Sequence, residues 1–246
     1  TAVPTLTSGR VAQPTYTLVT PPVGEVLRGR AGQTLAAGIK VTVKASSGTQ
    51  SSAGIPNIGV RLIPQLDPAT NPSAACAGAG DTALSDATGT INCNVVFGGV
   101  LGGPVPITVR VGGGGQGGTS YTVRIEVDAG APGRIDILGG NGQSGAPGAA
   151  LATPLSIEVS DGFGHTLAGE AVTWESVTPG GVTFLSAQET TDAGGRASAT
   201  VQLGGVAGQY QVRVRAGSAQ AVFNLYVVVP VSSLVKIDGD LQSAQT

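Results

Sequence analysis

Residues 188–203 read QETTDAGGRASATVQL, and residues 82–97 read TALSDATGTINCNVVF. Both stretches contain a Thr/Ser-Asp-Ala-x-Gly turn followed by a segment in which apolar and polar residues alternate. Alternation with a period of two is the pattern of a half-buried strand, and Asp and Gly are favoured in turns. The chain therefore carries the same turn and strand twice, which predicts a repeated all-β unit.

The repeat continues on both sides of these stretches. Residues 107–111 (ITVRV) match 210–214 (YQVRV), and residues 134–144 resemble 233–243. The spacing is roughly 100 residues, enough for one small β domain. Four segments are predicted: 1–14 as an N-terminal arm, 15–130 as domain 1, 131–232 as domain 2, and 233–246 as the first strand of a third repeat or a strand donated to another subunit.

Domain 1 departs from the repeat across about 45–80, where an insertion carries Pro64, Pro68, Pro72 and Cys76. The linkers between the repeats are short, which predicts a semi-rigid rod rather than independently tumbling domains. The chain starts at Thr1 with no signal-peptide pattern, so we expect a processed product or a piece of a longer protein.

Composition supports the all-β interpretation and excludes several kinds of partner. Hydrophobic residues make up 41% of the chain and charged residues 11%, and there are 40 Gly and 15 Pro. Such a chain favours strands and turns over helices. The net charge of −2 and the lack of a basic stripe argue against nucleic-acid binding. No apolar run approaches the ~20 residues that span a bilayer, so no transmembrane segment is predicted.

Seven short strands are expected in domain 2. Leu155, Ile157 and Val159 are predicted to face inward on the second strand, and Trp174 on the third and Phe184 on the fourth are predicted to lie in the core. The motifs GEAVTW (169–174), GGVTFL (180–185), TTDAGGRA (190–197) and GGVAGQYQV (204–212) resemble the bacterial Ig-like domain of the invasin/intimin type (group 1). The resemblance implies tandem immunoglobulin-like β-sandwiches. It also implies a role as a stalk, an adhesin tip or an accessory module, because domains of this family serve as all three.

Cys76 and Cys93 are the 2 cysteines of the chain and are predicted to form a disulfide. Cys93 alternates in phase with Val95 and Phe97, which places all three on the core face of their strand. A bridge to Cys76 would tie the insertion to the sandwich, with a contribution of about 3 kcal/mol in the chain-entropy model. Such a bridge predicts an oxidising compartment.

Asp86 and Asp192 open the two repeated turns. A carboxylate at the first position of a turn accepts hydrogen bonds from backbone N–H groups, which explains these residues by itself. The alternative is calcium at a domain edge. Calcium takes six to eight oxygen ligands, whereas each turn supplies one carboxylate, and turn formation is therefore the favoured interpretation.

No pattern predicts catalysis or a cofactor. Gly140, Gly142 and Gly145 match a dinucleotide fingerprint, but a strand pattern rather than a helix follows them. His165 is the 1 histidine and lies in a predicted loop without a nucleophile elbow nearby. We therefore expect no enzyme, no cofactor and no metal.

The favoured function is a non-enzymatic stalk or adhesin-type module of an extracellular or cell-surface bacterial protein. One alternative is a subunit of a filament or surface layer joined head to tail by strand donation. Another is an accessory module of a secreted polysaccharide-degrading enzyme. The partners expected are proteins or further copies of the chain, and carbohydrate is supported least, because the core claims several of the few aromatic residues.

Overall fold

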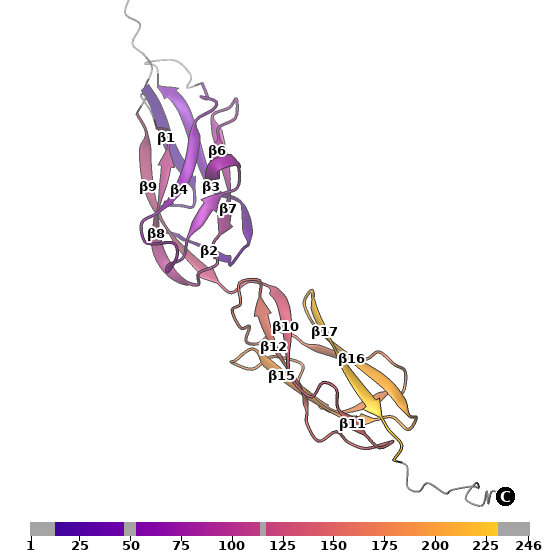
Figure 1. Cartoon of the computed structure of the whole chain (residues 1–246). Coiled ribbons are helices and arrows are strands. Elements are labelled where there is room, and N and C mark those ends of the chain that lie inside the picture. The colour runs from indigo at the N-terminus through magenta and orange to yellow at the C-terminus, as the bar shows by residue number, and fades with distance from the viewer. Residues whose placement is uncertain (1–12, 47–52, 114–116, 231–246) are drawn as a thin grey trace, which may run out of the picture. The chain divides into compact units, whose positions relative to one another are not determined.

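The computed structural model describes residues 13–46, 53–113 and 117–230, and within them the fold is all-β, as predicted. The chain passes from one compact unit to a second between Ala131 and Pro132 (Figure 1). The predicted N-terminal arm lies almost wholly outside the described residues, and so does the segment 233–246 with its two interpretations. No described helix is long and apolar enough to cross a membrane.

Unit 1 is a sandwich of two sheets. The first sheet has the order β1 (Gln13–Thr20), β3 (Thr34–Ser46), β7 (Thr90–Phe97), β5 (Ala74–Cys76). The second has the order β2 (Val26–Arg30), β9 (Thr119–Asp128), β8 (Gly102–Val111), β4 (Gly59–Pro64), β6 (Thr82–Leu84), and a 3-10 turn at Ala79–Asp81 precedes β6.

Unit 2 repeats this plan with one strand fewer in its second sheet. Its first sheet has the order β10 (Pro132–Gly139), β12 (Leu155–Asp161), β15 (Arg196–Leu203), β14 (Val182–Ala187). Its second has the order β11 (Ser144–Gly145), β17 (Ala219–Val227), β16 (Gly208–Ala216), β13 (Thr173–Ser176). The strand that unit 1 has in addition is β6, which pairs with the outer edge of β4.

The alternating pattern that identified the strands also fills the cores. On β12, Leu155, Ile157 and Val159 are 0% exposed, as the sequence predicted for this strand. On β7, Ile91, Cys93, Val95 and Phe97 are buried while the residues between them are more accessible. Each unit thus closes its own apolar core between its two sheets, the main source of stability in a small domain.

Both units pair an early strand in parallel with their last strand. In unit 1, β2 lies parallel to β9 over five residue pairs, from Val26 opposite Arg124 to Arg30 opposite Asp128. In unit 2, β11 lies parallel to β17 over two pairs. The strand β11 was not among the seven predicted for domain 2, because two residues in a Gly-rich stretch carry no readable alternation.

Candidate functional site

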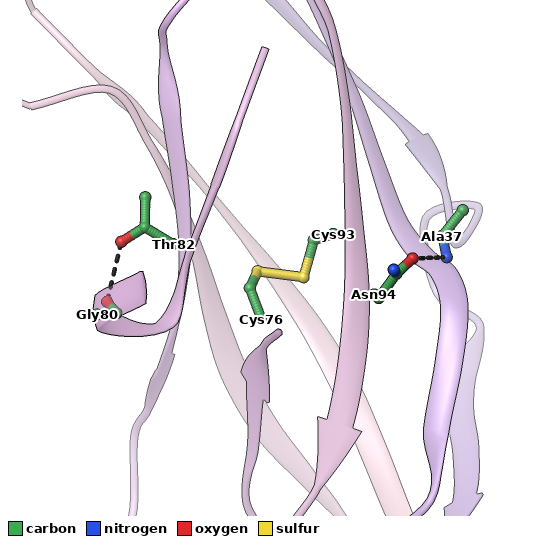
Figure 2. Close-up of a disulfide and its surroundings, with 6 residues drawn as sticks. All are labelled: Ala37, Cys76, Gly80, Thr82, Cys93 and Asn94. Carbon is green, nitrogen blue, oxygen red and sulfur yellow. Dashed lines mark hydrogen bonds between the residues drawn. A yellow bond between two sulfur atoms is a disulfide. The ribbon is translucent and has the colours of Figure 1, made fainter. Parts of the chain in front are cut away.

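The predicted disulfide joins Cys76 on β5 to Cys93 on β7, and both sulfur-bearing residues are almost fully buried. β5 is the edge strand next to β7, so the bridge fastens part of the predicted insertion to the first sheet, as Figure 2 shows. Both cysteines of the chain are consumed by the bridge. Its role is therefore structural, and no thiol remains for redox chemistry.

Near the bridge, two side chains form hydrogen bonds with backbone groups in a turn and at a shift of strand register (Figure 2). The Asn94 side-chain oxygen accepts a hydrogen bond of 2.8 Å from the backbone N–H of Ala37. Ala37 has a φ of 48° and lies where the pairing of β3 with β7 shifts register. At the other side, the Thr82 hydroxyl donates to the Gly80 carbonyl over 2.9 Å in the turn before β6.

Asp86 and Asp192 occupy equivalent turns. The Oδ1 atom of Asp192 accepts from the N–H groups of Gly194 at 2.8 Å and Arg196 at 2.9 Å. Asp86 Oδ1 accepts from the Thr88 N–H at 2.8 Å and the Thr90 N–H at 3.0 Å. Each aspartate thus stabilises its own turn, which is the role that the favoured interpretation gives it.

Hydrogen bonding to the ionised carboxylates lowers the pKa of both turn aspartates. For Asp86 the main cause is the Thr88 hydroxyl, which donates to Oδ1 over 2.6 Å, followed by the Thr90 N–H. For Asp192 the main cause is the Arg196 N–H, followed by the Gly194 N–H. In the described part of the chain, no three His, Cys, Asp or Glu side chains gather as metal ligands would.

The three aromatic residues predicted for the core differ in burial. Phe97 is 1% exposed, on the inner strand β7. Trp174 and Phe184 are only partly buried, so their placement in a closed core is corrected. The physical reason is that β13 and β14 are the edge strands of their sheets, and no described strand covers their outer sides.

Trp174 and Phe184 line a hollow of ≈ 510 Å³ together with Val172, Ala187 and Glu189, among others. The indole N–H of Trp174 donates to the Gln188 carbonyl over 2.9 Å, and its ring lies 6.0 Å from that of Phe223. The tryptophan is therefore anchored at one side and accessible at the other. We call this the edge hollow of unit 2.

The chain has structural neighbours among known proteins. No protein-family model and no curated protein match the chain. Among solved structures, domains 4 and 5 of the S-layer protein SbsC match with a TM-score of 0.37 at 16% identity, covering 90% of this chain and 100% of theirs. The Escherichia coli adhesin FdeC matches with 0.44 at 18% identity, covering 88% of this chain and 65% of its own. The D00–D0 domain of intimin matches with 0.35 at 13%, covering 87% and 100%.

At these identities and TM-scores the likeness concerns the fold alone. Two further sequence motifs lie in turns and loops. The fingerprint-like glycines lead into the short strand β11, and Gly140 and Gly142 both have positive φ, as turns require. His165 stacks on Phe163 in the segment after β12, with ring centroids 6.3 Å apart.

Cross-strand charge pairs are the feature that sequence reasoning missed. Arg196 lies opposite Glu158 with 3.1 Å between charged atoms, and Arg28 lies opposite Glu126 with 2.6 Å. Arg213 and Glu175 form a third pair on β16 and β13, at 3.4 Å. The repeat aligns Arg110 in 107–111 with Arg213 in 210–214, and this match could have indicated equivalent charged positions in the two domains. The strand that pairs with Arg110 lies within the predicted insertion of domain 1, where the repeat could not be followed.

Proposed function

We propose that this chain is a load-bearing, non-enzymatic segment of an extracellular bacterial protein, of the stalk or adhesin type. The observation that carries the proposal is the parallel pairing of an early strand with the last strand in each unit. In a parallel pair, tension on the two chain ends pulls the strands past each other along their axes. All hydrogen bonds between them are then loaded together, in shear, whereas tension across a hairpin breaks them one at a time.

Two further features suit a protein under tension outside the cell. The disulfide between Cys76 and Cys93 limits how far unit 1 can extend, and such bridges persist in oxidising surroundings. Three residues, 129–131, separate β9 from β10, so little slack chain lies between the units. The sequence resemblance to bacterial Ig-like domains of the invasin/intimin type points to the same class of protein.

Single-molecule stretching of the whole chain tests the proposal. Two unfolding events are expected, with unit 1 giving way at the higher force, because five residue pairs hold β2 to β9 and two hold β11 to β17. The disulfide identifies unit 1. Reduction of the bridge allows the chain between the two cysteines, a sequence separation of 17, to extend. The extension measured on unfolding of unit 1 should then increase by about 60 Å.

The matched control applies load through Gln209 and Tyr226, which face each other on the hairpin β16–β17. Handles at these two positions peel hydrogen bonds singly, so unit 2 is expected to open at a lower force than when it is pulled from its ends. Equal forces in the two directions would contradict a load-bearing role.

A second candidate function, self-assembly, is favoured by the open edge of β13. Val177 donates to the Gln211 carbonyl, so alternation along the strand directs the backbone groups of Trp174 and Ser176 away from β16. We propose that a strand from a neighbouring copy adds to this edge. Residues 233–246 resemble a first strand in sequence and are the donor proposed.

Negative-stain imaging of the protein beside a version lacking residues 233–246 distinguishes the two candidates. Filaments that vanish on deletion, with a blue shift of tryptophan emission in the polymer, support self-assembly, since the chain has 1 Trp and it lies at the edge hollow. Separate molecules in both samples leave the load-bearing segment as the function.

A further inference from the structure

The outer face of unit 1 carries two arginines directly opposite each other. Arg61 on β4 pairs with Arg110 on β8 in the antiparallel register. Their neighbours Val60 and Val109 are 0% exposed, so strand alternation turns both arginines outward on the same face. Like charges at directly opposed positions destabilise a sheet, so this arrangement is a local cost to the fold.

Unit 2 shows what the same position looks like when it is compensated. Val111 corresponds to Val214 in the repeat, and Val60 faces Val111 as Trp174 faces Val214. The next position along therefore matches Arg61–Arg110 with Glu175–Arg213. Unit 2 has an ion pair of 3.4 Å there, whereas unit 1 has an arginine in place of the glutamate.

The surroundings of the two arginines are polar but not acidic. Thr82 lies opposite Arg61 on β6, and Ser120 lies opposite Arg110 on β9, so hydroxyl-bearing residues flank both cations in one row. Both arginines line a hollow of ≈ 610 Å³, which we call the arginine hollow. None of its described lining residues is acidic; besides the arginines they include Tyr16, Asn57, Ile63 and Thr82.

We infer that the arginine hollow binds a small acidic saccharide, a sugar ring bearing a carboxylate or a sulfate. Two guanidinium groups present planar forks of donors that match the oxygens of these anions. The hollow has the volume of an ordinary small-molecule site. Tyr16 offers an aromatic ring and Asn57 an amide for the ring hydroxyls. The bound anion supplies the negative charge that Glu175 supplies in unit 2.

Titration followed by NMR, with glucuronic acid and glucose 6-sulfate as probes, tests the inference. Saturable shifts of the Arg61 and Arg110 side-chain signals are expected with either probe, and none with glucose. Whichever acid binds more tightly identifies the anionic group. The Arg61→Glu variant restores the charge pattern of unit 2 and is expected to weaken binding about tenfold or more. It also relieves the repulsion, so it remains folded.

The matched control is Glu175→Arg, which places two arginines opposite each other on unit 2, where residue 175 lines none of the described hollows. No gain of saccharide binding is expected there. The inference is overturned if this variant binds as well as Arg61–Arg110 does, since charge alone would then suffice. It is also overturned if Arg61→Glu binds undiminished, or if inorganic sulfate binds as tightly as the sugars. These outcomes do not bear on the force measurements.

Discussion

The two units differ most at one edge of the sandwich. In unit 1, β6 pairs with β4 and sets Ala83 opposite Val60, and Val60 is 0% exposed. In unit 2, β13 ends its sheet, and Trp174, at the position of Val60, remains partly accessible. Between β4 and β7, unit 1 forms two short strands, β5 in the first sheet and β6 in the second. The corresponding segment of unit 2, between β13 and β15, forms β14 alone.

This difference shows how one fold can be stabilised in two ways. Unit 1 covers the outer side of β4 with the additional strand β6 and fastens β5 to β7 with a disulfide. Unit 2 lacks that strand, and Trp174 and Phe184 line the hollow between its edge strands β13 and β14. An uncovered edge is a place where another strand can add. Because unit 2 has no strand equivalent to β6, the edge of β13 is open to such a strand.

The sharpest test of the comparison removes one aromatic ring from each unit. Phe97→Ala is expected to lower the free energy of unfolding of unit 1 by about 3–5 kcal/mol, because the ring is fully enclosed. Phe184→Ala is expected to cost unit 2 about 1–2 kcal/mol, because its ring is partly hydrated already. Denaturant titrations measure both, with tryptophan emission following unit 2 and tyrosine-resolved NMR following unit 1. Equal losses would contradict the difference in burial.

Removal of the disulfide by Cys76→Ala with Cys93→Ala is expected to cost about 3 kcal/mol, since the bridge restricts the unfolded chain. Only unit 1 is expected to lose stability. The midpoint of thermal unfolding of unit 2, monitored by the emission of Trp174, should be unchanged, while the midpoint of unit 1 falls. A parallel fall of both midpoints would show that the units unfold as one, against the separate cores described above.

Exchanging the cross-strand charges gives a smaller effect of opposite sign in the two units. Arg61→Glu is expected to stabilise unit 1 by about 0.5 kcal/mol, and Glu175→Arg to destabilise unit 2 by a similar amount. Both effects should shrink in high salt, because the substituted residues Arg61 and Glu175 are solvent-exposed and their charges are screened. A change of the same sign in both units would refute the equivalence of the two positions.

The turn aspartates give the smallest change at neutral pH, because Asn can still accept through its Oδ1. Because the pKa of each aspartate is lower in the folded than in the unfolded state, ionisation of the carboxylate stabilises the fold. This contribution to the free energy of unfolding is complete above the unfolded-state pKa and is lost as the pH falls through the folded-state pKa. Asp86→Asn and Asp192→Asn should therefore flatten the acid limb of the stability curve. The Thr88 hydroxyl is the main cause of the lowered pKa of Asp86. Thr88→Val should therefore reduce the acid-limb contribution of Asp86 and leave that of Asp192 unchanged.

Periodicity was enough to predict seven strands of unit 2 and which of their residues face inward. Leu155, Ile157 and Val159 follow a strict alternation, and all three are buried as predicted. The disulfide was also predictable, because the chain holds 2 cysteines and one of them lies in phase with the core. Local patterns carry this kind of information, since the period of a strand decides which side chains face inward.

The burial of Trp174 and Phe184 could not be predicted in the same way. A bulky aromatic residue at an inward position looks the same in sequence whether its strand is central or at an edge. What separates Phe97 from Phe184 is whether another strand lies beside them, and that depends on pairing between distant segments. The arginine pair could not be predicted for the same reason, because Arg61 and Arg110 become neighbours only through the register between β4 and β8.

The sequence by itself therefore determined the all-β class, the repeat, the two turns and the bridge, all of which follow from the order of residues along short stretches. The tertiary structure decided which strands lie at edges, which early strand runs parallel to the last, and which charges face each other. These are consequences of register between segments far apart in the chain, and register is set by the packing of the whole core.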